Sequence, residues 1–123
     1  MNGRKTKQQR RQEREHSERM AAAIRAAVPV LLRTTPDGNE VWQAGPATVV
    51  VPVVPLDAPT EMQQAVTAYR MANLTGRCPH CELHVEVELD GRVFFHHKAV
   101  CPAHPDEIKA LGERLGIEVT RRT

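Results

Sequence analysis

The 123-residue chain has few aromatic residues, which limits the kind of core that it can build. The only aromatic side chains are Trp42, Tyr69, Phe94 and Phe95. Burial must therefore depend on Ala, Val, Leu and Ile, and at this length the core of a single domain is modest. The scarcity of aromatic rings also argues against binding of single-stranded nucleic acid by base stacking. Such a chain gains stability from a metal site that crosslinks it.

The sequence also lacks the segments that would send it to a membrane or out of the cell. No run approaches the roughly eighteen consecutive apolar residues that a membrane-spanning helix needs. The first residues, Met1 to Lys5, lack the apolar stretch of a secretory signal. We therefore expect a cytoplasmic protein that has no membrane partner and no small-molecule substrate.

Cysteine is scarce as well, since the chain has three, and their spacing is its most informative pattern. Cys78 and Cys81 are separated by two residues, and after nineteen intervening residues Cys101 and His104 repeat that spacing. Three cysteines cannot all pair, and closely spaced cysteines in a reducing compartment more often hold metal than form disulfides. Two such pairs can converge on one tetrahedral ion, so we expect one structural Zn²⁺ bound by Cys78, Cys81, Cys101 and His104.

The fourth zinc ligand, unlike the three thiols, has competitors in the sequence. His80, His96 and His97 are near enough in sequence to compete with His104. His80 lies between two ligands and would strain a chelate with them. The alternative to a metal site is that the three cysteines are small buried residues without metal.

Positive charge is concentrated at the start of the chain. Residues 1–33 carry nine Lys or Arg against three Glu, whereas residues 34–77 and 78–123 each carry two more acids than bases. Any attraction to phosphate should begin in the first segment. The candidate nucleic-acid-binding residues are Arg4, Lys5, Lys7, Arg10, Arg11 and Arg14. A solvated, partly disordered tail and a protein-docking helix are the alternatives.

Residue patterns predict helices and a small sheet in the first two thirds of the chain. The end of the polar N-terminal helix, just before Pro29, is predicted to dock on the core. Its apolar residues recur there at helical spacing: Met20, Ile24, Ala27 and Val28. Residues 30–54 predict a three-stranded antiparallel meander with a turn at 36–39 and an edge strand ending at Pro52. Thr60 and Gln63 resemble a capping box at the start of a helix that ends at Gly76.

The segment from Leu83 to Lys98 predicts a β-hairpin because its residues alternate around Asp90-Gly91, a strong signal for a two-residue turn. The pairing that follows from such a turn places these side chains on one, largely buried, face: Val85, Val87, Phe94 and His96. His84 and His97 then form an exposed pair on the opposite face. A helix should open at Pro105 and stop near Gly116, and residues 117–119 could add a last strand.

The expected architecture is a single small α+β protein. We divide it into a basic polar N-terminal helix or arm (1–28), a β-meander with a connecting helix (29–75) and a zinc-binding module (76–123). A ligand pair, a hairpin and a second pair that leads into a helix resemble the treble-clef zinc fingers, with the zinc ribbons as a close neighbour. The resemblance covers about forty residues and implies that one turn supplies Cys78 and Cys81 while the start of a helix supplies Cys101 and His104. It implies a nucleic-acid-binding or protein-binding module more often than an enzyme.

Three enzymatic interpretations are weaker. Cys78-Pro79-His80-Cys81 is also the active-site tetrapeptide of DsbA-type thiol oxidants, but there it opens a helix and here a hairpin follows. His84-Val85-Glu86 resembles the H-x-E of zinc deaminases, but the Cys-x-x-Cys precedes it instead of following it. A nuclease of the HNH kind would need a general-base His and a catalytic cation, and no convincing Asp–His dyad with a downstream Asn is present.

We therefore expect a non-enzymatic zinc protein whose basic arm binds nucleic acid or a nucleoprotein surface. The alternative is a protein-interaction adaptor or a structural subunit of a larger assembly, for example one derived from a phage. Alternating Arg and Glu at helical spacing in the first segment would suit such a charged protein interface.

Overall fold

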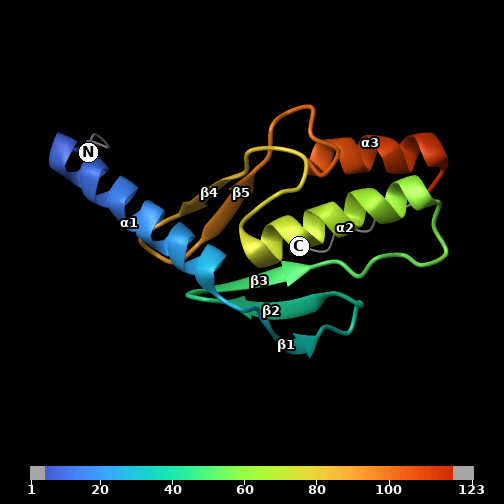
Figure 1. Cartoon of the computed structure of the whole chain (residues 1–123), viewed down its shortest axis with the longest axis horizontal. Helices are drawn as coiled ribbons and strands as arrows, with labels where there is room; N and C mark the ends of the chain where they lie inside the picture. Colours follow the sequence, from blue (N-terminus) through green and yellow to red (C-terminus); the bar gives the residue numbers. More distant parts are fainter. Residues whose placement is uncertain (1–4, 118–123) are drawn as a thin grey trace.

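The computed structural model describes residues 5–117, which form the expected α+β fold (Figure 1). Three helices and two small antiparallel sheets make up this part of the chain. In chain order the elements are α1 (Lys7–Ala26), β1 (Val30–Thr34), β2 (Glu40–Ala44), β3 (Ala47–Val51), α2 (Thr60–Thr75), β4 (His84–Val87), β5 (Val93–His96) and α3 (Pro105–Leu115). None of these helices has the length and apolar character needed to cross a membrane.

Helix α1 is continuous through the basic segment and into the core. It begins with a capping box in which Thr6 accepts a hydrogen bond from the backbone N–H of Gln9 and the Gln9 side chain accepts one from Thr6. Its second half is anchored by the buried side chains of Ala21 and Ile24. Val28, predicted to belong to the apolar stripe, lies beyond the end of the helix and is 85% exposed, because the chain becomes extended at Ala27.

The three-stranded meander predicted for residues 30–54 is confirmed. Its strands lie in the order β1-β2-β3, so β3 is an edge strand and ends at Val51, just before Pro52. The turn between β2 and β3 contains Gly45 at φ +61°, and a Cβ there would lie 2.9 Å from the carbonyl oxygen of Ala23 in α1. A glycine at this position therefore lets α1 pack directly on the meander.

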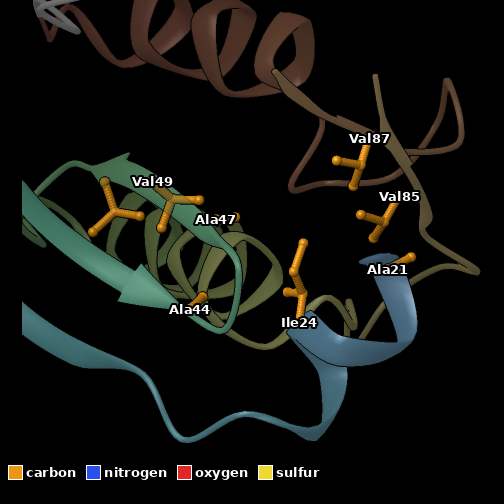
Figure 2. Close-up of a cluster of buried hydrophobic side chains, with 8 residues drawn as sticks. Ala21, Ile24, Ala44, Ala47, Val49, Val85 and Val87 are labelled. Atoms are coloured by element: carbon orange, nitrogen blue, oxygen red, sulfur yellow. The ribbon is translucent and has the colours of Figure 1, made fainter. Parts of the chain in front are cut away.

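Side chains from α1 and from both sheets form one buried cluster (Figure 2). Its members are Ala21, Ile24, Ala44, Ala47, Val49, Val51, Val85 and Val87. Small and β-branched residues dominate it, as the composition predicts. All three predicted segments of the chain contribute to this cluster, so the second half of α1 joins the two sheets.

The β4–β5 hairpin is present, but its predicted register is wrong by one residue. Val85 pairs with Phe95 and His84 with His96, where the expected partners were His96 and His97. The reason is the turn. The backbone N–H of Glu88 donates to the carbonyl of Arg92 and the N–H of Gly91 donates to the carbonyl of Glu88, so the loop has three residues, with Gly91 at φ +94°.

A two-residue turn of type I′ requires positive φ at both central residues, and Asp90 does not have it. The one-residue shift turns every side chain of β5 to the other face of the hairpin. Phe95 therefore packs against the core while Phe94 and His96 are exposed, which is the reverse of the predicted arrangement. The same shift turns His97, the next residue, toward the interior.

Helix α1 also covers the free edge of β4, which would otherwise expose unpaired backbone groups. The N–H of Val87 donates to Ser17 Oγ at 2.9 Å, and His16 Nε2 donates to the carbonyl of Glu88 at 3.2 Å. These two bonds fix the hairpin to the middle of α1.

Helices α2 and α3 pack on each other through a second cluster: Met62, Ala65, Val66, Ile108 and Leu111. Gly76 and Gly116 end them in the left-handed conformation, as predicted. The capping box predicted at Thr60 is wrong, because Pro59 holds the N-cap position and the Gln63 amide donates to the carbonyls of Leu56 and Ala58 instead. The strand predicted for residues 117–119 falls mostly outside the described residues.

Candidate metal centre

Three separate turns bring four potential ligands together. Cys78 and Cys81 lie in the turn that follows α2, His97 follows β5, and Cys101 lies in the turn before α3. The ligand atoms of these four residues all lie within 4.8 Å of one another. The group packs on α2 through Ala68, so the predicted zinc module and the connecting helix share one small core.

The distances between the ligand atoms fit a tetrahedral zinc ion. Cys78 Sγ lies 3.6 Å from Cys101 Sγ, and His97 Nδ1 lies 3.7 Å from the Sγ atoms of both Cys81 and Cys101. Zinc bonds of about 2.3 Å to sulfur and about 2.0 Å to nitrogen place tetrahedral ligands about 3.5–3.8 Å apart. The three cysteines are free thiols, and 3.6 Å is far beyond the roughly 2.05 Å of a disulfide.

Backbone amides support the thiolates that such an ion requires. The N–H of His80 points at Cys78 Sγ at 3.5 Å, and the N–H of Ala103 points at Cys101 Sγ at 3.4 Å. Each amide belongs to the second residue after its cysteine, so the two tight turns are related in form. Donors to sulfur stabilise the charged thiolate over the neutral thiol.

The pKa values of Cys81 and Cys101 are shifted in opposite directions. Burial raises the pKa of Cys101 to about 12. Burial also acts to raise the pKa of Cys81, but the backbone N–H of Lys98 and the two neighbouring thiols outweigh it, so that pKa is lowered. A buried thiol such as Cys101 becomes an effective ligand only when a cation compensates the charge of its thiolate, which is what Zn²⁺ would supply.

His97 is suited to coordination through Nδ1. Burial, together with the nearby His104, lowers its pKa, which favours the neutral imidazole that a metal needs. The ring stacks on Tyr69 of α2 at 6.3 Å between centroids, and this contact holds its orientation. Its other nitrogen, Nε2, is buried and has no hydrogen-bond partner among the described residues.

His104, the expected fourth ligand, is outside the group, and His97 stands in its place. His104 is the N-cap of α3, where its Nδ1 accepts a hydrogen bond from the backbone N–H of Asp106 at 3.0 Å. This nitrogen is therefore engaged in starting the helix. His97 is one of the competing histidines in the sequence, but the predicted two-residue turn at Asp90-Gly91 would place it on the exposed face of the hairpin.

The other histidines near the ligands do not join them. His80 is exposed within the first turn. His84 and His96 face each other on the outer side of the hairpin, with ring centroids 5.7 Å apart. His96, predicted to be a buried core histidine, is thus an exposed residue.

The candidate nucleic-acid-binding residues lie away from this centre, along the first half of α1 (Figure 1). The side chains of this set that the structure describes, all exposed, are Lys5, Lys7, Arg10, Arg11 and Arg14. Arg4 lies outside the described residues. Two of the cations are paired with acids, Lys5 with Glu13 at 2.7 Å and Arg11 with Glu15 at 3.8 Å.

These observations define a small α+β protein with one closed zinc site of three cysteines and one histidine. No protein-family model matches the chain, and no match was found among curated proteins or among solved structures. The function must therefore be argued from the site and the surface alone.

Proposed function

We propose that the chain is a non-enzymatic binding protein in which zinc holds the fold and the first half of α1 contacts nucleic acid or a nucleoprotein surface in the cytoplasm. Four protein ligands complete the tetrahedral shell of zinc and leave no position for a substrate, which supports a structural role for the metal. The order of turn, hairpin and helix resembles a treble-clef finger. The supply of the fourth ligand by His97 after the hairpin, rather than by the start of the helix, departs from that pattern.

The observation that carries the proposal is a stripe of cations on one face of α1. Lys7, Arg10, Arg11 and Arg14 follow one another at helical spacing and line a shallow surface depression together with Gln8. The stripe runs over about 10 Å of helix at a rise of about 1.5 Å per residue. Within residues 5–117, Lys7, Arg10 and Arg14 form no salt bridge, so their charge is available to a partner.

The position of the stripe within the helix points the same way. The N-terminal end of a helix carries partial positive charge, and acids there stabilise it, yet the first turn of α1 contains no acid. Lys7 and Arg10 therefore add to a charge that the helix already has. This concentration of positive charge costs stability in the free protein and favours a polyanion.

The anchoring of α1 explains how such a stripe would be presented. The second half of the helix is fixed by Ile24 and by its contacts with β4, while the first half extends past the hairpin (Figure 1). Zinc holds the hairpin on which the helix rests. The metal would thus support nucleic-acid binding indirectly, by holding α1 in position, without contacting the nucleic acid.

Binding should depend strongly on salt and little on sequence. Neutralising about four phosphates gives a slope of about −3.6 in log K against log salt, or roughly a 10²-fold loss of affinity between 50 and 200 mM. A mobility-shift series with duplex DNA and RNA measures it. The double variant R10Q/R14Q should bind at least about tenfold more weakly and lower the slope by about two.

A matched control removes two cations from α3. The variant K109Q/R114Q has the same net charge as R10Q/R14Q, but its changes lie far from the stripe, so it should bind like the unchanged protein. Equal losses of affinity in the two variants would show that binding depends on net charge and not on the stripe. An absence of binding by the unchanged protein at low salt would refute the proposal.

The alternative, a protein-interaction adaptor or a subunit of a larger assembly, is favoured by a different surface. Strand β1 is exposed along its whole length and is one of the two edge strands of the meander, and Val30, Leu31 and Leu32 are 46–57% exposed. An apolar edge strand can pair with a partner protein. Co-purification from the native source separates the two functions, since nuclease treatment releases a nucleic-acid partner and leaves a protein partner bound.

A further inference from the structure

The outer face of the β4–β5 hairpin carries a second constellation of metal-binding side chains that the zinc centre does not use. His84 and Glu86 lie two residues apart on β4, so they share a face of the strand, and His96 lies directly opposite His84 on β5. All three face away from the buried Val85 and Val87. His96 joins the other two side chains because the register of the hairpin places it opposite His84, and the spacing along the sequence alone does not predict this.

The side chains are already in contact. His96 Nε2 donates to Glu86 Oε1 at 2.8 Å, and the rings of His84 and His96 stack at 5.7 Å between centroids. Phe94 also stacks on His96, at 6.3 Å between ring centroids, and so restricts the position of that ring. His84 and His96 are exposed and Glu86 is half-buried, so an ion could reach them from solvent.

We propose that His84, Glu86 and His96 form a second, solvent-accessible site for a divalent first-row transition cation. Two imidazoles and one carboxylate on one face supply three ligands and leave the remaining positions of the ion open. This ligand set differs from that of the closed zinc centre, where thiolates occupy three of four positions. The imidazoles favour ions such as Zn²⁺, Fe²⁺, Co²⁺ or Ni²⁺ over Mg²⁺ and Ca²⁺, which prefer oxygen.

Occupation of the site requires a small rearrangement. Among residues 5–117, the zinc-centre group is the one whose potential ligand atoms all lie within 4.8 Å of one another. The ligand atoms of His84, Glu86 and His96 are therefore farther apart than this, and the ring of His84 must turn toward the other two side chains to bind the same ion. An exposed ring on a strand can make this movement without disturbing the core. The 2.8 Å between Glu86 Oε1 and His96 Nε2 is near the roughly 3 Å that separates neighbouring ligands in an octahedral shell with bonds of about 2.1 Å.

The surrounding charge favours a cation. The segment from residue 82 to residue 92 carries four acids against one base, Arg92, and this base is held at the turn by Glu88 and Asp90. Within the described salt bridges, Glu86 pairs with His96 and with no Lys or Arg. A cation would replace the proton that His96 now shares with this carboxylate.

The test is a titration of the zinc-loaded protein with Co²⁺. The unchanged protein should bind one further equivalent without the intense absorption of cobalt–thiolate bonds, since the closed centre keeps its zinc. The variants H84A and E86Q should each weaken this binding at least about tenfold, because loss of even an indirect supporting partner of a metal costs about 10–100-fold.

The matched control is H80A, which removes an exposed side chain that belongs to neither set of ligands and keeps the backbone N–H that points at Cys78 Sγ. It should bind the second ion as the unchanged protein does. Failure to bind a second equivalent, or equal affinity in H84A, E86Q and H80A, would overturn the proposal. Circular dichroism and one retained zinc per chain establish that each variant is folded, and these changes on an exposed face leave the fold intact.

Discussion

Replacement of His97 tests the corrected ligand set most sharply against the one that the sequence pattern predicts. Structural zinc sites of this kind have apparent binding free energies of about 10–16 kcal/mol, so one of four ligands contributes roughly 3–4 kcal/mol. The substitution H97A should therefore weaken zinc binding by about 10²–10³-fold, at 1.4 kcal/mol for each factor of ten. It also removes the stack on Tyr69 and a side chain that is partly buried between α2 and the hairpin.

The comparison variant is H104A. It removes the side chain that accepts a hydrogen bond from Asp106 at the start of α3, so it should cost about 1 kcal/mol of stability and change zinc affinity by less than about tenfold. Competition with a chromophoric chelator of known affinity measures both variants. The inverse result, in which H104A releases zinc and H97A retains it, would refute the register of the hairpin as well as the ligand set.

The remaining predictions concern packing, charge and metal removal. G45A should destabilise the fold by at least about 1–3 kcal/mol in urea denaturation, because the positive φ and a carbonyl oxygen of α1 at 2.9 Å both oppose a Cβ. The control G38A is also at positive φ but has open space around it, so it should cost less stability. A hydrogen bond from Trp42, together with Arg70, lowers the pKa of Glu40, so the carboxylate contributes stability above about pH 4.5 that is lost as the pH falls through its lowered pKa. R70A should weaken this dependence of stability on pH. An unchanged dependence in R70A would show that the Glu40–Arg70 salt bridge does not contribute to it. Chelation of zinc should increase hydrogen exchange in β4, β5 and the second half of α1, which share one buried cluster, and protection that persists there would show that the hairpin does not need the metal.

Much of the fold follows from local sequence patterns. The meander, the two glycine-terminated helices and the hairpin were all predicted, because alternation, turn residues and left-handed caps are properties of neighbouring residues. The three cysteine ligands were predicted for the same reason, since each pair of ligands in a tight turn has a fixed spacing. The continuity of α1 through the basic segment was not certain from its polar composition, because a helix without an apolar stripe depends on its anchored end.

The fourth ligand could not be predicted in the same way. Asp90-Gly91 is compatible with a two-residue or a three-residue turn, and the choice depends on which face of β5 the rest of the protein buries. Phe95 packs toward Val85 and Val87, where the second half of α1 closes the core, and this tertiary contact selects the longer loop. His97 then points to the cysteines, while His104, at the predicted spacing, serves as a helix cap.

X-ray absorption at the zinc edge of the purified protein tests the central claim most directly. The account predicts one zinc per chain with three sulfur ligands at about 2.3 Å and one nitrogen at about 2.0 Å, and the nitrogen contribution should be lost in H97A and retained in H104A. A protein that holds no zinc, or a spectrum without sulfur ligands, would contradict the account.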